Sequence, residues 1–209
     1  KEDYKIISDK ITYLKNEEKI FTEGTTEGSI YSKYIFKSKD IVFFKNNLEL
    51  ISKNKTTIQD DNSNFYSLDK FSYSLKNEEV KGQNILIISN YNLPKSDKVF
   101  FTSGIIDLKN QNFIAQNIKI ETHKTIFNNP ENQPRLKGVS SRKDGHITVI
   151  NKGIFTSCKE NDKCPPWVIE ANEIKHDKKK KQLIYKDALL KIYDFPVFYF
   201  PKFFHPDPS

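Results

Sequence analysis

A short unit recurs along this chain and limits it to a fold of stacked strands. Each copy has an apolar residue, a spacer, and a ring or polar residue, and then a polar turn and a second apolar segment. The copies begin at Ile11, Ile41, Phe71, Ile105 and Ile174, and the first three lie thirty residues apart. Because a single β-hairpin is marginal in water, this fixed period predicts that successive hairpins stack around a shared apolar interior.

A degenerate copy lies between Ile105 and Ile174, from Val139 to Val149. It turns at Asp144-Gly145, a dipeptide typical of two-residue hairpin loops. Alanine is rare and the chain holds 16 Phe and 10 Tyr, so strands are favoured over long helices. We therefore predict an all-β fold, an open β-jellyroll or β-roll of stacked antiparallel hairpins.

One face of these strands is predicted to form the interior of the roll. Its members are the residues that recur at equivalent repeat positions: Ile11, Tyr13, Ile41, Phe43, Phe71, Tyr73, Ile105 and Ile174. Such a stripe is first a hydrophobic core. A roll that stays open along its length has a second use for the same residues, because acyl chains fit an apolar interior.

The charge balance gives little support for nucleic acid as a partner. The net charge is +7, from 34 Lys and Arg against 27 Asp and Glu, but only Arg135 and Arg142 are arginines. Bidentate recognition of phosphates and guanines favours the planar guanidinium group, so we expect no nucleic acid partner. The run Lys178–Lys181 is interpreted as a solvated hairpin tip that protects a strand edge, with a patch for anionic headgroups as the alternative.

No constellation of residues indicates catalysis. The four histidines, His123, His146, His176 and His205, lack metal-ligand spacing, and no phosphate loop or nucleophile motif occurs. We expect neither an enzyme nor a cofactor nor a metal site.

Two cysteines suggest an oxidising compartment. Cys158 and Cys164 are six positions apart, which suits a local disulfide that stabilises by about 2 kcal/mol in the loop-closure model. Such bonds persist in exported proteins, whereas free thiols are usual in the cytosol.

The last fifteen residues differ from the rest. Residues 195–209 are aromatic and broken by proline, and they are more apolar than a solvated tail. We divide the chain into a repeat domain, residues 1–194, and this terminal segment, residues 195–209.

Several segments resemble a known family. They are Cys158–Trp167, Ala171–Asp177, Tyr185–Ala188, Phe195–Pro201 and His205–Pro208. Together they resemble the end of the periplasmic domain of the LptD family of lipopolysaccharide-assembly proteins. The hairpins before them resemble the OstA-type domain that this family shares with the bridge protein LptA and with LptC.

The resemblance implies an OstA-like periplasmic domain that receives lipopolysaccharide from an LptA-like bridge and shields the acyl chains in its interior. In the family, lipid then passes to an outer-membrane barrel plugged by the lipoprotein LptE, and the sequence stops where that barrel would begin. The junction with the barrel would hold Phe195, Pro196, Phe198, Phe200 and Pro201. A bridge would add its strand to the first hairpin.

Three questions stay open from the sequence. In the family, cysteines of this domain pair with cysteines of the barrel, so Cys158 and Cys164 have either each other or the barrel as partners. A packed structural β-solenoid that binds nothing is one alternative function. A free-standing LptA-like bridge protein is the other.

Overall fold

The described residues form one large antiparallel sheet and no α-helix, so the all-β prediction is confirmed. The computed structural model describes residues 4–123, 133–159 and 166–207. A single turn of 3-10 helix, Lys15–Glu17, joins the first two strands. The fifteen strands are β1 Tyr4–Leu14, β2 Lys19–Ile30, β3 Tyr34–Lys39, β4 Val42–Phe44, β5 Glu49–Ser52, β6 Thr56–Asp60, β7 Phe65–Ser74, β8 Glu79–Ile88, β9 Lys98–Asp107, β10 Asn112–Glu121, β11 Arg135–Asp144, β12 Ile147–Thr156, β13 Trp167–Asp177, β14 Gln182–Ile192 and β15 Phe195–Pro206.

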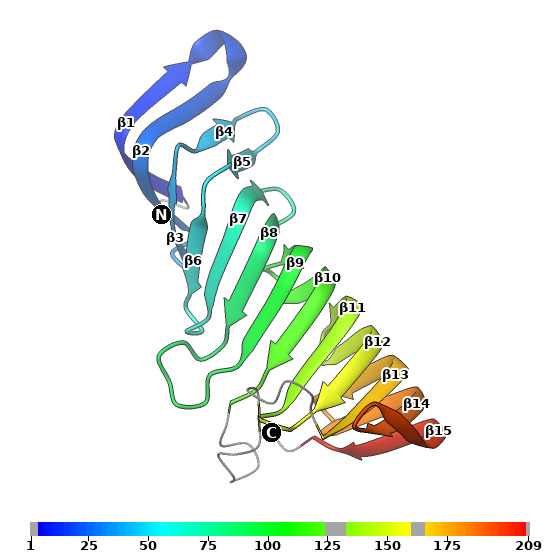
Figure 1. The fold of residues 1–209 in the computed structure, drawn as a ribbon. Coiled ribbons are helices and arrows are strands. Elements are labelled where there is room, and N and C mark those ends of the chain that lie inside the picture. The colour runs from blue at the N-terminus through cyan, green and yellow to red at the C-terminus, as the bar shows by residue number, and fades with distance from the viewer. Residues whose placement is uncertain (1–3, 124–132, 160–165, 208–209) are drawn as a thin grey trace.

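The strands lie side by side in nearly the order of the chain (Figure 1). From β7 to β15 every strand pairs with the next. Before β7, two places in the sheet are each occupied by a pair of short strands instead of one long strand. Strands β3 and β4 both pair with β2, and β5 and β6 both pair with β7. Among the described strands β1 pairs only with β2 and β15 only with β14, so the sheet does not close on itself.

A left-handed residue stands in the middle of many strands. Lys70, Asn84, Asn117, Lys152 and Asp187 have φ between 48° and 51°. The pairing ladders skip these positions, as in the β9–β10 and β13–β14 ladders. A bulge of this kind bends a strand sharply. We call the resulting line of bends the corner of the roll.

The corner divides each long strand into two halves and the sheet into two walls. The turn wall holds the halves next to the tight turns at residues 75–78, 108–111, 145–146 and 178–181. The loop wall holds the other halves, which lead to the connections around residues 61–64 and 89–97 and to residues 122–123 and 133–134. Both walls present one apolar face to the space between them.

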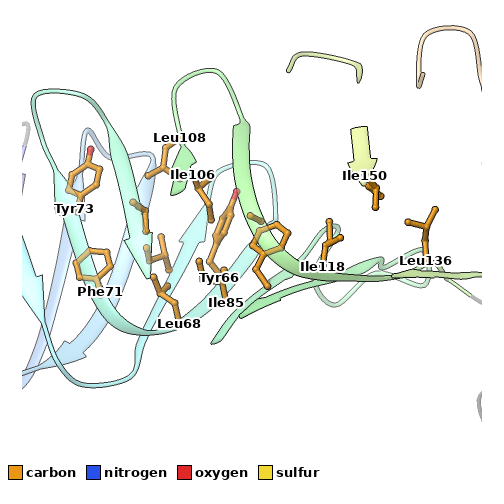
Figure 2. Close-up of a cluster of buried hydrophobic side chains, with 14 of the residues drawn as sticks. Tyr66, Leu68, Phe71, Tyr73, Ile85, Ile106, Leu108, Ile118, Leu136 and Ile150 are labelled. Atoms are coloured by element: carbon orange, nitrogen blue, oxygen red, sulfur yellow. The ribbon is translucent and has the colours of Figure 1, made fainter. Parts of the chain in front are cut away.

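Inward residues follow a spacing of two, three and two. In β7 they are Tyr66, Leu68, Phe71 and Tyr73, all buried. The step of three crosses the corner, where the extra residue keeps both halves facing inward. Figure 2 shows side chains of neighbouring strands meeting in this interior.

At the corner, a large residue is paired with a small one on six of the described strands, β8 to β10 and β12 to β14. The pairs are Gly82 with Ile85, Gly104 with Phe101, Ala115 with Ile118, Ile150 with Gly153, Ile174 with Ala171, and Tyr185 with Ala188. A Cβ atom at Gly153 would lie 2.5 Å from Cδ1 of Ile174, and one at Gly138 would lie 2.2 Å from Cγ2 of Ile150. Beside these glycines the bend therefore has no room for a second large side chain, whereas β7 holds two large residues there, Leu68 and Phe71.

The predicted interior residues fall into three groups. Ile41, Phe71, Tyr73 and Ile174 are at most 1% exposed and belong to the core, and Phe43 is half-buried against it. Their contact with acyl chains stays a prediction.

Ile11 and Tyr13 are exposed, by 50% and 46%, although they lie on the inward face. Tyr13 pairs with Ile20 of β2, and Ile20 pairs with Phe43. The end strand β1 carries its apolar face into solvent because the second wall does not cover it there.

The prediction for Ile105 was wrong. It faces outward, 39% exposed, opposite Lys81 and the exposed Ile114, while its neighbour Ile106 is buried. Two adjacent isoleucines give no alternation, and an error of one residue moves a side chain to the opposite face.

Alanine substitutions at these two isoleucines test the assignment. We expect Ile106→Ala to lower the free energy of unfolding by about 2–4 kcal/mol, because it empties buried space. Ile105→Ala should cost less than about 1 kcal/mol, as at most surface positions. Urea unfolding followed by circular dichroism measures both. Equal losses would contradict the inward placement of Ile106.

A double-mutant cycle tests the corner packing. Gly153→Ala should cost about 1–3 kcal/mol through overpacking against Ile174. In the Ile174→Ala background the same change should be nearly neutral, because the obstructing Cδ1 and Cγ1 atoms are gone. Additive free energies of unfolding would show that the two positions do not compete for the corner.

Candidate functional site

A cavity of about 330 Å³ lies between the two walls in the later half of the roll. Its loop-wall side is lined by inward residues of β7 to β12, and its turn-wall side by inward residues of β9 to β14. The apolar lining consists of Tyr66, Ile87, Val99, Ile120, Leu136 and Phe155 on the loop wall, and Ile106, Phe113, Ile150 and Leu183 on the turn wall.

The bend at the corner brings these residues together. Val99 and Ile106 belong to the same strand, β9, and are seven positions apart. In a straight strand seven residues span about 23 Å. Both nevertheless line one cavity, as do Phe113 and Ile120 of β10. Folding each strand over itself makes two walls from one sheet.

The walls touch on either side of the cavity. Toward the N-terminal half, the hydroxyl of Tyr34 donates a hydrogen bond of 3.2 Å to the carbonyl oxygen of Leu108. Toward the C-terminal half, the ring of Phe155 lies 5.5 Å from that of His205 and 6.4 Å from that of Tyr185, measured between centroids. The cavity occupies the stretch between these contacts.

At the corner, strand β11 carries smaller inward side chains than the strands beside it. Its two corner residues are Gly138 and Ser141, both small, and its turn-wall inward residue is Lys143 rather than an apolar one. Ser141 is buried, and its hydroxyl has no hydrogen-bond partner in the part of the chain that the structure describes. Because β11 adds no large side chain at the corner, the interior beside it is not packed solid.

Polar residues border the cavity on both walls. We call Gln111, Lys143 and Lys178 the turn lip, because they lie at the tight turns. Residues of the facing wall make the loop lip: Asn64, Ser89, Asp97, Thr122 and Arg135.

The cations of the two lips have no carboxylate partner among the described residues. Nζ of Lys143 donates to the carbonyl oxygen of Gln111 at 2.5 Å. Arg135 donates to the carbonyl oxygens of Cys158, Lys159 and Gln133. Burial and, to a smaller extent, the charge of Lys178 hold the pKa of Lys143 below its usual range.

The two carboxylates at the cavity, Asp207 and Asp97, have partners other than the lip cations. Asp207 lies 2.6 Å from Nε2 of His176, and both side chains are mostly buried. Asp97 accepts a hydrogen bond of 2.9 Å from the backbone N–H of His123. The cavity thus combines an apolar interior with a border that holds three cations, Arg135, Lys143 and Lys178, without a carboxylate partner in the described part of the chain.

None of the eight predicted interior residues lines this cavity. Ile41, Phe71, Tyr73 and Ile174 pack in the core beside it, and Ile11 and Tyr13 lie at the far end of the sheet. Sequence reasoning missed Phe113 because the repeat was aligned on its first strand, and it missed Val99 and Leu136 because the alignment covered only the half of that strand next to the turn. The alternation around Ile118 and Ile120 was the signal that marked the second strand.

The predicted junction residues lie on the end strand of the same sheet. Phe195 and Phe198 are 77% and 59% exposed, and Pro196 and Pro201 are exposed as well. Phe200 is half-buried and packs against Phe203 at 5.3 Å. Their role as a junction, and the boundary at residue 194, stay predictions.

The disulfide also stays a prediction. Cys158 is half-buried, and its Sγ lies 3.8 Å from the carbonyl oxygen of Trp167. Cys164 lies outside the described residues.

Comparison of the chain with protein-family models and with curated proteins finds no match in either set. In residues 4–123, 133–159 and 166–207, no helix has the length and apolar character to span a membrane. The same residues hold no group of three His, Cys, Asp or Glu side chains suited to a metal ion.

The partly buried position of Lys143 predicts a pH-dependent contribution to stability. The folded state disfavours its ammonium form, so between the lowered pKa and the ordinary value of about 10.4 the unfolded state binds more protons. The free energy of unfolding of the natural protein, relative to a Lys143→Met variant, should therefore rise with pH in that window. Urea unfolding between about pH 8 and pH 10.5 measures it.

Lys179→Met is the matched control, since Lys179 is exposed at a turn. A Lys143→Met curve that rises no more steeply than the Lys179→Met curve would contradict the effect of burial at Lys143.

Proposed function

We propose that this chain is a lipid-carrying domain of a lipopolysaccharide-assembly protein, in which the roll shelters acyl chains. The observation that supports this most directly is the cavity between the walls, apolar inside and bordered by cations. A lipid with acyl chains and an anionic headgroup has the same division of chemistry.

The lining suits hydrocarbon chains. Aliphatic and aromatic side chains form both walls, and each methylene group removed from water contributes about 0.8 kcal/mol. The volume is at the lower end of the ~300–1,000 Å³ typical of ligand sites. The cavity therefore takes part of a lipid, such as one chain, while the rest extends past the lips.

The remainder of the proposal rests on the sequence resemblance to the LptD family. On that basis the domain works in the periplasm, takes lipopolysaccharide from an LptA-like bridge, and delivers it toward an outer-membrane barrel with LptE. The exposed aromatic residues of β15 are consistent with an apolar environment or partner at that end.

Both alternatives fit the structure less well. A structural solenoid has a packed interior, whereas this interior holds a cavity beside β11. A free-standing bridge shares the roll, but it has no need for an end strand with a Phe195 that is 77% exposed.

Photo-crosslinking from two adjacent positions of β10 tests lipid binding. Phe113 lines the cavity, whereas Ile114 is 61% exposed on the outer face. Benzoylphenylalanine at position 113 of the purified domain should form adducts with lipopolysaccharide, and the same probe at position 114 should not. Adducts are detected as a mobility shift with an antibody against lipopolysaccharide.

Circular dichroism and urea unfolding establish that both labelled proteins are folded. Adducts at neither position in folded protein would overturn the proposal and favour a structural roll. Equal adducts at both positions would indicate surface adsorption of lipid rather than uptake between the walls.

A further inference from the structure

The turn lip carries two lysines that line the cavity, and neither forms an ion pair among the described residues. Lys143 is the last inward residue of β11 before its turn, and Lys178 begins the turn after β13. Both line the cavity. They come from hairpins that are neighbours in the sheet, because β12 pairs with β11 and with β13.

Their hydrogen bonds leave donors for a ligand. Nζ of Lys143 has one acceptor, the carbonyl oxygen of Gln111, and an ammonium group has three N–H donors. The backbone N–H of Lys178 donates to the carbonyl oxygen of His146, and among the described residues its side chain has no ion pair. The two charges are close enough that Lys178 lowers the pKa of Lys143.

Two like charges beside a partly buried cavity cost free energy unless an anion lies between them. The two acids that line the cavity do not neutralise these lysines. Asp207 is paired with His176, and Asp97 lies on the opposite lip. An anionic group held at the turn lip would satisfy the donors and lift the repulsion.

We propose that Lys143 and Lys178 form a headgroup site for a phosphate-bearing amphiphile whose chain enters the cavity between the walls. This inference rests on the proposed function, because the chain is what brings the phosphate to the lip. Arg135 faces the site from the loop lip, but its guanidinium group is held by the carbonyl oxygens of Cys158 and Lys159. Arg135 therefore adds positive charge there, but not a free guanidinium group for bidentate binding of phosphate.

Paired amphiphiles with the same chain test the site. Octyl phosphate and octyl glucoside are titrated into the purified protein by isothermal titration calorimetry, below their micelle concentrations. Octyl phosphate should bind about tenfold more tightly, the effect of a charge-assisted hydrogen bond. Inorganic phosphate alone should bind far more weakly than octyl phosphate, because it lacks the chain.

Substitutions then locate the preference. Lys143→Gln and Lys178→Gln should each remove most of the preference for phosphate, measured as the ratio of the octyl phosphate and octyl glucoside affinities of the same variant. Lys143→Arg keeps the charge and should retain the preference. Lys179→Gln, one residue along the same turn, is the control and should behave as the natural protein.

Each contrary result has its own meaning. Equal affinity for the two amphiphiles in the natural protein would overturn the headgroup site and leave the apolar cavity standing. Inorganic phosphate that binds as tightly as octyl phosphate would show an anion site independent of any lipid. Binding of neither amphiphile would overturn the cavity as a lipid site, and the headgroup site with it.

Discussion

The bend in the middle of each strand is the constraint on which the rest of this structure depends. A flat sheet of these strands would expose one apolar face along its whole length. A left-handed residue at the bend of β7, β8, β10, β12 and β14 lets the sheet fold over along this line, and the step of three keeps both halves of a strand facing inward. On the outside of the corner, side-chain hydrogen bonds join neighbouring strands: Asn84 to Asp69, Asn117 to Thr102, and Asn151 to Ser140, each at 3.0 Å.

The narrow corner decides where the interior is solid. Strands β8 to β10 place their large corner residue on the loop-wall side, as Phe101 and Ile118 do. Strands β12 to β14 place it on the turn-wall side, as Ile150 and Tyr185 do. Strand β11 lies where this arrangement reverses and has a small residue on each side. The cavity extends to both sides of β11. The same arrangement of large and small residues that packs the core therefore leaves the candidate site open.

The inward residues of the turn wall also change from apolar to polar along the roll. Inward positions of the turn wall are apolar in the first half of the roll, with Phe43, Tyr73 and Ile106 in one row of paired strands. In the same row β11 and β13 carry Lys143 and His176. The interior therefore changes from a sealed core to a cavity with a polar border along the axis of the roll. Under the proposed function, this change would give a lipid one place that suits both its chain and its headgroup.

Much of the fold was predictable because strand period and turn residues are local properties. The hairpin period, the polar turns and the antiparallel order required only alternation along the chain. The same local information placed Phe71, Tyr73 and Ile174 in the core. It failed at Ile105, where two adjacent apolar residues left the face undecided until the bend was known.

The sequence by itself determined that this protein is a roll of stacked hairpins with an apolar interior. Only the tertiary structure decided which part of that interior is open and which cations border it. The reason is that Val99 and Ile106, or Arg135 and Lys143, become neighbours across a space only after the strand folds at its corner. The small residues of β11, unremarkable in sequence, matter because of what their neighbours place beside them.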